Sequence, residues 1–172
     1  MSKDGLKEFC MQLDKIAAQA GKAEYVKEAG QFVRGAAVVR CPGNSGYLRD
    51  NIYCNFNESE EAARSEVYTN VSYAPYVELG TGPRGAASHD GISPQTSPAY
   101  TTEPWWIHES QVDQQIAEQY HWPYIKTDQG RFYVCSGQPA HPFMYPALKD
   151  NEQKVLRILE DGMNKILEGA GK

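Results

Sequence analysis

The sequence lacks a long hydrophobic run, and it has too little positive charge to bind nucleic acid tightly. No stretch approaches the roughly 20 apolar residues that cross a bilayer. The first thirteen residues carry Lys3, Asp4, Lys7 and Glu8 where a secretory signal needs an apolar segment. The formal charge is −5 and the arginines are scattered, whereas tight DNA binding requires clustered Lys and Arg. We therefore expect no membrane insertion, while a weakly acidic wall would still let DNA slide past.

The cysteines give no sign of a disulfide framework or a redox motif. The chain has four of them, Cys10, Cys41, Cys54 and Cys135, and none forms a Cys-x-x-Cys pair. This pattern favours a cytosolic protein with reduced thiols. Cys10 and Cys54 fall on predicted apolar faces, so we expect them to behave as small buried hydrophobic residues.

Motifs that signal catalysis or metal binding are also missing. Gly-x-Ser-x-Gly does not occur, and the glycine-rich run Gly80–Gly85 lacks the Gly-Lys-Ser/Thr of a phosphate loop. The conceivable zinc ligands, whose spacing matches no common zinc pattern, are His108, His121, His141 and Cys135. We predict no catalytic residue, no cofactor and no metal. A small hydrolase and a DNA-binding module remain alternatives from other functional classes.

Hydrophobic periodicity predicts a helix at each end of the chain. Residues from about Gly5 to Arg40 place apolar side chains three and four positions apart, and Gly21 weakens or bends this helix. The first half of its stripe is Leu6, Phe9, Leu13, Ile16 and Ala20. A final helix is predicted to begin near Pro146, because proline is favoured in a first helical turn.

Between these helices the period changes to that of β-strands. Alternation over Ile52–Phe56 and Glu66–Tyr73 predicts a hairpin, and a second hairpin is predicted around Thr127–Gly130. A short helix is expected within Ser110–Tyr120. The predicted fold class is α+β, with a small, mostly antiparallel sheet packed by a long N-terminal and a C-terminal helix. We expect one domain over residues 1–172, with a long inserted loop and the second hairpin in an insertion at about 83–137.

The segment Tyr73–Gly82 is the most informative part of the chain. Ala74-Pro75 suits a helix start and Gly80 suits a stop, so the segment predicts one short helical turn. The stretch from Gly82 to Pro104 is irregular, and a surface excursion and a binding arm are equally compatible with it. It is followed directly by Trp105 and Trp106, whose large apolar area is unsuited to full exposure in a soluble monomer.

Aromatic residues concentrate in the middle and later part of the chain. Tyrosine and tryptophan are favoured at protein interfaces, although some of these side chains must belong to the core. Glu78 is expected either to pair with an arginine of another subunit or to face water. The residues predicted to contact other subunits or partners are Tyr73, Tyr76, Glu78, Thr81, Arg84, Tyr100, Trp105, Trp106, Pro142 and Phe143.

The order of these segments resembles the gene-product-ten-like family of neck, or tail-completion, proteins of long-tailed bacteriophages. The resemblance rests on Tyr-Ala-Pro-Tyr-Val-Glu-Leu-Gly-Thr-Gly at Tyr73–Gly82, on Gln-Pro-Ala-His-Pro-Phe-Met-Tyr-Pro-Ala-Leu at Gln138–Leu148, and on the closing helix. Between Pro83 and Gly137 this chain is longer than the short members of the family.

The resemblance implies a structural virion protein at the head–tail interface, assembled in the host cytoplasm. It implies a ring of identical subunits, often six, through which viral DNA passes without sequence-specific binding. The implied partners are further copies of the chain, a head-side connector or stopper, and a tail terminator or tail tube protein. Within the virion, a tail terminator or a minor tail component is the alternative role.

Overall fold

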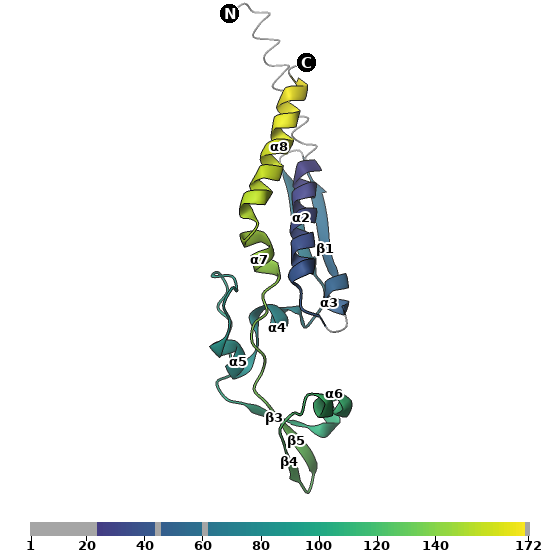
Figure 1. The fold of residues 1–172 in the computed structure, drawn as a ribbon, viewed down its shortest axis with the longest axis vertical. Helices are drawn as coiled ribbons and strands as arrows, with labels where there is room; N and C mark the ends of the chain where they lie inside the picture. The colour runs from purple at the N-terminus through teal and green to yellow at the C-terminus, as the bar shows by residue number, and fades with distance from the viewer. Residues whose placement is uncertain (1–23, 44–45, 60–61, 171–172) are drawn as a thin grey trace, which may run out of the picture. The chain divides into compact units, whose positions relative to one another are not determined.

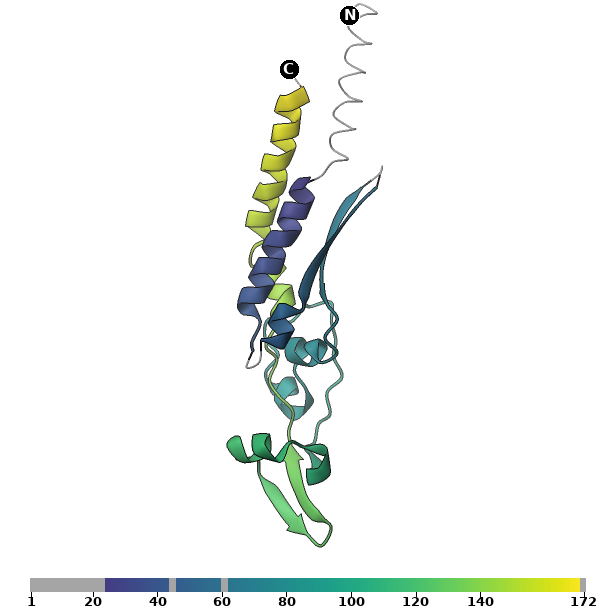
Figure 2. The ribbon, with the colours of Figure 1, turned by 90° about the vertical axis from the view of Figure 1, so that its right-hand side faces the viewer.

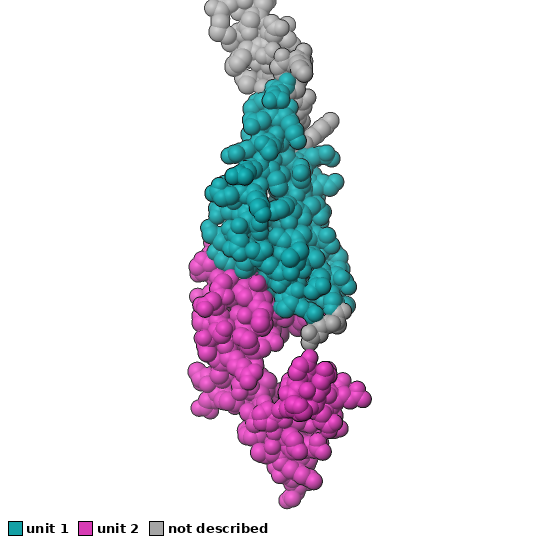
Figure 3. Space-filling view, viewed as in Figure 1, with its two compact units in different colours: residues 1–71, 143–172 teal, residues 72–142 magenta. Residues whose placement is uncertain are grey.

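The chain forms two compact units joined at residues 71–72 and 142–143. The computed structural model describes residues 24–43, 46–59 and 62–170. The first half of the predicted N-terminal helix, including its apolar stripe and Cys10, lies outside these residues. Unit 1 comprises residues 1–71 and 143–172, and unit 2 comprises residues 72–142 (Figure 3). Each unit has a small antiparallel sheet, which confirms the predicted α+β class.

Unit 1 is built around one central helix. Helix α2 (Glu24–Arg40) lies between a β-hairpin, β1 (Ile52–Glu58) and β2 (Ala63–Thr69), and the C-terminal helices (Figures 1 and 2). The short helix α3 (Tyr47–Asp50) leads into β1. The C-terminal part consists of α7 (Met144–Lys149) and α8 (Glu152–Ala170). The core of this unit is therefore the contact of α2 with the elements on both of its sides.

The first hairpin alternates as the sequence predicts. Ile52 is fully buried, and Cys54 is half-buried opposite Val67 on the face toward α2. On the other face, the rings of Tyr53 and Tyr68 lie 5.8 Å apart between centroids. The second strand begins and ends earlier than predicted, because the chain leaves the hairpin at Thr69.

Small residues allow α2 to approach the hairpin closely. Ala29, Gly30 and Ala37 are its buried residues. A Cβ added at Gly30 would lie 2.5 Å from the Cβ of Ser65, whose hydroxyl donates a hydrogen bond of 2.8 Å to the carbonyl of Val26. The absence of a side chain at Gly30 therefore fixes the distance between helix and hairpin.

The C-terminal helix is interrupted, whereas the sequence predicted one continuous helix from near Pro146. Asn151 separates α7 from α8, and its buried side-chain amide donates to the carbonyl of Ala147 at 3.0 Å. Across the break, Lys149 and Glu152 form an ion pair of 2.8 Å. Their hydrogen bond and mutual attraction lower the pKa of Glu152 and raise the pKa of Lys149. At this junction, the side-chain interactions of Asn151, Lys149 and Glu152 accompany the break between α7 and α8.

Unit 2 combines two short helices with a three-stranded sheet. The helices are α4 (Ala74–Leu79) and α5 (Gly82–Ala87). Strands β3 (Trp105–His108), β4 (Tyr124–Thr127) and β5 (Gly130–Cys135) pair antiparallel in the order β3-β5-β4. The predicted second hairpin is thus confirmed, and β3 adds a strand that the sequence did not indicate.

Two details of unit 2 differ from the predictions. The expected helix within Ser110–Tyr120 is a 3-10 turn, η1 (Glu109–Gln111), followed by α6 (Gln114–Gln119). Ala117 is the buried residue of α6, while Ile116 and Tyr120 are exposed. The long irregular stretch is shorter than predicted, because α5 occupies its first part.

Gly30→Ala is expected to destabilise the protein, whereas Gly35→Ala is expected to stabilise it. Both glycines lie in α2, where alanine is favoured by about 1 kcal/mol. A Cβ at Gly35 meets nothing within 4 Å, but one at Gly30 collides with Ser65, and overpacking costs about 1–3 kcal/mol. Urea unfolding of the two full-length variants measures the difference. Equal stabilisation by both changes would show that α2 does not approach the hairpin this closely.

Candidate functional site: the clasp at the base of the insertion

Two segments far apart in the sequence bind each other within unit 2. We call residues 76–88 and 136–141 together the clasp. At its centre, the amide of Thr81 donates to the carbonyl of Gln138 at 2.9 Å, and the amide of Gln138 donates back to Thr81 at 3.1 Å. This exchange forms an antiparallel β-bridge that lies outside the named strands. It joins the two ends of the predicted insertion.

Further hydrogen bonds extend the clasp on both sides of this bridge. The amide of Arg84 donates to the carbonyl of Ser136 at 3.1 Å, and that of Ala140 donates to the carbonyl of Ser88 at 2.9 Å. The amide of His141 reaches the carbonyl of Val77 at 2.8 Å. The side-chain amide of Gln138 donates to the carbonyl of Tyr76, also at 2.8 Å. The clasp is therefore held mainly by backbone groups.

The local sequence explains why the first segment can take part. Pro75 lies in the first turn of α4, where its missing N–H costs nothing. Gly80 ends the helix with a φ of 76°, which confirms the predicted short helical turn. The following residue, Thr81, is extended and so presents its N–H and C=O to Gln138.

Glycines at the clasp leave room for backbone and for aromatic rings. Gly137 has a φ of 75°, and a Cβ there would overlap the carbonyl oxygen of Thr81. A Cβ at Gly82 would lie 2.7 Å from the ring of Trp105, and one at Gly85 would lie 2.8 Å from the ring of Tyr100. The clasp therefore requires glycine at these positions for steric reasons.

A cavity of about 380 Å³ lies beside α4 and is mainly apolar. Its aromatic walls are Tyr76, Tyr100 and Trp105. The hydroxyl of Tyr100 donates to the carbonyl of Leu79 at 2.6 Å, which fixes one wall against the helix. Such an aromatic, proline-lined hollow suits apolar protein segments better than a charged substrate.

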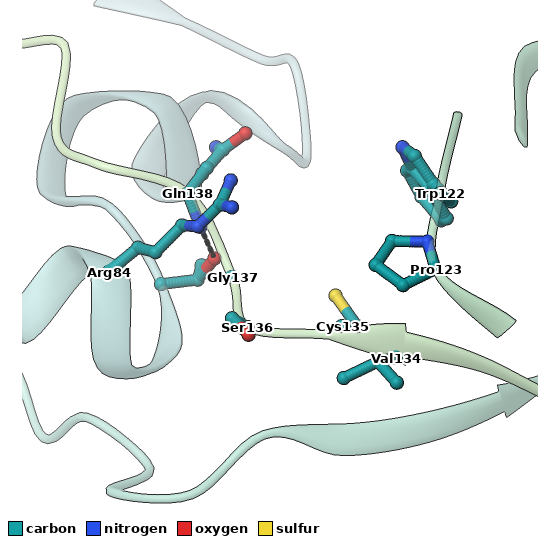
Figure 4. A pocket seen from close by; sticks show the side chains of 9 residues that line it. Arg84, Trp122, Pro123, Val134, Cys135, Ser136, Gly137 and Gln138 are labelled. Atoms are coloured by element: carbon teal, nitrogen blue, oxygen red, sulfur yellow. Dashed lines mark hydrogen bonds between the residues drawn. The ribbon is translucent and has the colours of Figure 1, made fainter. Parts of the chain in front are cut away.

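A second cavity, of about 330 Å³, lies between the clasp and the sheet of unit 2 (Figure 4). Arg84 and Gln138 form one side, and Trp122 and Pro123 form the other, with Cys135 between them. Arg84 is the one charged side chain among the residues that line the two cavities. Neither cavity therefore presents the paired acid and base that hydrolysis usually requires.

The clasp brings together five of the residues predicted from the sequence to contact partners, namely Tyr76, Thr81, Arg84, Tyr100 and Trp105. Tyr73 and Trp106 are exposed at 42% and 51%, so both have surface to offer. Glu78 and Pro142 are half-buried. Phe143 is fully buried in unit 1, so its ring has no surface for a partner in this conformation.

Sequence reasoning missed the roles of Gln138 and Trp122. In the sequence, Gln138 is only the first residue of the segment Gln138–Leu148 that carries the family resemblance, but in the structure it supplies both the bridge and a side-chain hydrogen bond. Its signal was the preceding Gly137, which permits the left-handed backbone next to the bridge. Trp122 packs edge-to-face against the buried Tyr133, with centroids 6.3 Å apart, and it carried no periodic signal in an irregular turn.

The remaining polar groups of unit 2 act locally. His108 caps η1 through Ser110 and contacts the carbonyl of Gln129 at 2.9 Å. The guanidinium of Arg131 lies 5.1 Å from the ring centre of Tyr124. Over residues 24–43, 46–59 and 62–170, no three histidine, cysteine or acidic side chains gather as a possible metal site. In the same ranges, no helix has the length and hydrophobicity to span a membrane.

Gly137→Ala is expected to open the clasp, and Gly91→Ala provides a matched control. Both residues have positive φ, 75° and 81°, so each alanine carries about 1–2 kcal/mol of left-handed strain. Only at Gly137 does the new Cβ also overlap Thr81, because Gly91 has its nearest neighbour at 3.6 Å. Hydrogen exchange at the amides of Thr81 and Gln138 should accelerate in Gly137→Ala alone. Equal exchange in both variants would contradict the role of the clasp.

Comparison with known proteins gives one family and no individual relative. Residues 6–80 match the model of the family described as "Bacteriophage HK97-gp10, putative tail-component". The match ends at Gly80, so it includes α4 and the start of the clasp segment but not the rest of unit 2. Searches of curated proteins and of solved structures returned no match. Residues 6–80 are thus similar to the HK97-gp10-like family, which is described as a putative tail component of a bacteriophage.

Proposed function

We propose that this protein is a structural subunit of the phage neck that joins the DNA-filled head to the tail and turns over no substrate. The observation that carries the proposal is a concentration of exposed aromatic side chains on unit 2, which holds six of the nine exposed tyrosines and tryptophans among the described residues. These six are Tyr73, Tyr76, Trp105, Trp106, Tyr120 and Tyr124. Exposed aromatic surface of this kind is typical of protein–protein interfaces.

A ring of identical subunits is the assembly that these surfaces support best. Head-to-tail contacts that close by rotation need two different surfaces on each copy. The outer strands β3 and β4 of unit 2 each have one edge without a strand partner among the described residues, as do both strands of the first hairpin. Such edges readily accept a neighbouring chain. Six copies is the number we propose, in line with the family resemblance.

The proposed neighbours follow from a position between head and tail. One face of the ring would bind a head-side connector or stopper, and the other would bind a tail terminator or the tail tube. Viral DNA would pass through the lumen without sequence-specific contacts, for which the formal charge of −5 is suitable. A terminator or a minor tail component is the second candidate, because the matching family is described only as a tail component.

A small hydrolase is the candidate from another class, and the two cavities of unit 2 give it little support. The linings of these two cavities are mainly apolar side chains and backbone, with Arg84 as the single charged group. General acid–base catalysis requires titratable groups within hydrogen-bond reach of a substrate. The two cavities of unit 2 suit protein segments better, so we favour assembly over catalysis.

Trp106→Ala is expected to impair head–tail joining far more than it impairs folding. Trp106 is 51% exposed, and an interface tryptophan contributes about 2 kcal/mol or more, roughly a 30-fold loss of affinity. Trp105→Ala is a less specific change, because Trp105 also packs against Gly82. The assay adds purified protein to tailless heads and free tails that lack it, and counts joined particles by electron microscopy.

The control is Val39→Ala, which truncates an 83% exposed apolar side chain of unit 1. Wild type and this control should join particles equally well, and all three proteins should unfold at similar temperatures. Full activity of Trp106→Ala would remove Trp106 from the interface. Failure of the wild-type protein to restore joining, together with turnover of a small molecule by the monomer, would overturn the proposed function.

A further inference from the structure

Strands β3 and β4 form the two outer edges of the unit 2 sheet, and neither edge has a further strand partner among the described residues. All four residues of β4 are exposed, as are Trp105 and Trp106 of β3. We propose that β4 of one copy pairs in parallel with β3 of the next, so that the sheets of neighbouring subunits join. This inference rests on the proposed ring of identical subunits and specifies one contact within it.

The strand directions determine how two copies can meet at these edges. β3 and β4 each pair antiparallel with the central strand β5, so they run parallel to each other. Copies that repeat head to tail, with their sheets turned the same way, therefore place β4 beside the next β3 in parallel. A two-fold pair would join β4 to β4, or β3 to β3, and would leave the other edge uncovered. The head-to-tail contact covers both edges with one kind of interface.

The outer edge of β4 turns the backbone groups of two residues away from the sheet. The amide of Val134 in β5 donates to the carbonyl of Pro123 at 2.9 Å. In an antiparallel pair the residues that bond to the partner strand alternate. Ile125 therefore bonds to β5, whereas Tyr124 and Lys126 direct their N–H and C=O groups outward.

On β3 the same alternation selects Trp106 and His108. The residues of β5 on either side of Val134 turn toward β3, where they pair with Trp105 and Ile107. The backbone groups of Trp106 and His108 therefore point outward from the opposite edge of the sheet.

These outward groups complement each other in a parallel ladder, where each residue bonds to two residues of the next strand. The amide of Lys126 donates to the carbonyl of Trp106 of the next copy, and its carbonyl accepts from the amide of His108. The carbonyl of Tyr124 accepts from the amide of Trp106, and its amide donates to the carbonyl of Pro104. Proline has no N–H, and this ladder requires none from Pro104.

The side chains of the two edges match in this register. Tyr124 lies beside Trp105 of the next copy on one face of the sheet, and Ile125 lies beside Trp106 on the other. In the single subunit, Tyr124 and Ile125 are 52% and 48% exposed, and Trp105 and Trp106 are 37% and 51% exposed. The contact therefore covers the exposed large hydrophobic side chains of both strands, and aromatic pairs gain more than their buried area alone provides.

Other registers lose this match. A slip by one residue directs the facing side chains of the two strands to opposite faces. Both strands have four residues, so a slip by two leaves half of each strand without a partner. It also separates Tyr124 from Trp105. The aligned register is thus the one that satisfies both the backbone and the side chains.

Disulfide trapping in joined head–tail particles tests the pairing. Ile107→Cys/Lys126→Cys introduces thiols at positions that lie opposite each other in the proposed ladder, so a link between them should form. Within one subunit these positions lie on strands separated by β5, about 9.5 Å apart, and a disulfide bridges Cα atoms up to roughly 7 Å apart. A link between positions 107 and 126 therefore joins two copies.

The control variant is Ile107→Cys/Thr127→Cys, which places the second thiol on the opposite face of the sheet. It should give at least tenfold less of the corresponding link. Peptide mass spectrometry identifies the linked positions and separates them from links to the native Cys135.

Lys126→Pro provides the second measurement. The amide of Lys126 points away from β5, so proline removes no hydrogen bond of the single sheet, and proline is tolerated at such positions of edge strands. It does remove the donor to Trp106 of the next copy. Lys126→Pro should join at least tenfold fewer particles than Lys126→Thr, which keeps the N–H. Particles are counted at a temperature at which circular dichroism shows both variants folded.

The outcomes separate this inference from the proposed function. Joined particles without a link between positions 107 and 126, a link between two copies of position 107, or equal joining by Lys126→Pro and Lys126→Thr would overturn the pairing and leave the proposed function standing. Failure of the wild-type protein to join heads and tails would overturn both. If the double-cysteine variant joins no particles, the comparison of Lys126→Pro with Lys126→Thr decides alone.

Discussion

The exchange of two hydrogen bonds between Thr81 and Gln138 is the constraint on which unit 2 depends. It joins positions 57 residues apart in the sequence, so everything between them becomes a closed loop. The aromatic walls of both cavities lie inside this loop or at its edge. Without the bridge, the exposed Tyr73 and Tyr76 would lose a constraint on their positions relative to the tryptophans of strand β3, and partner binding would have to order them first.

The parts that could be predicted from the sequence are those set by local periodicity. Alternation around Cys54 predicted the first hairpin, and Pro75 with Gly80 predicted the short helix α4. The second hairpin followed from its turn residues at Thr127–Gly130. These signals depend on neighbouring residues alone, so they can be recognised in a single sequence.

The parts that could not be predicted depend on contacts between distant residues. Strand β3 contains two adjacent tryptophans and pairs with β5, about 30 residues later in the sequence. No local sequence pattern predicts this strand. Asn151 interrupts the final helix through a side-chain hydrogen bond to Ala147. At the candidate site, tyrosines are predicted from their residue type, but the bridge at Gln138 is made by its backbone groups, for which residue type gives no signal.

Because the clasp holds both ends of the insertion together, changes in the length of the insertion have little effect on stability. For a closed loop, doubling the number of residues costs only about 0.6 kcal/mol of entropy. Residues 88–104, which form neither helix nor strand, can therefore gain or lose segments while the rest of the subunit keeps its structure. A viral lineage could remodel this loop for a new neighbour and retain the same scaffold beneath it.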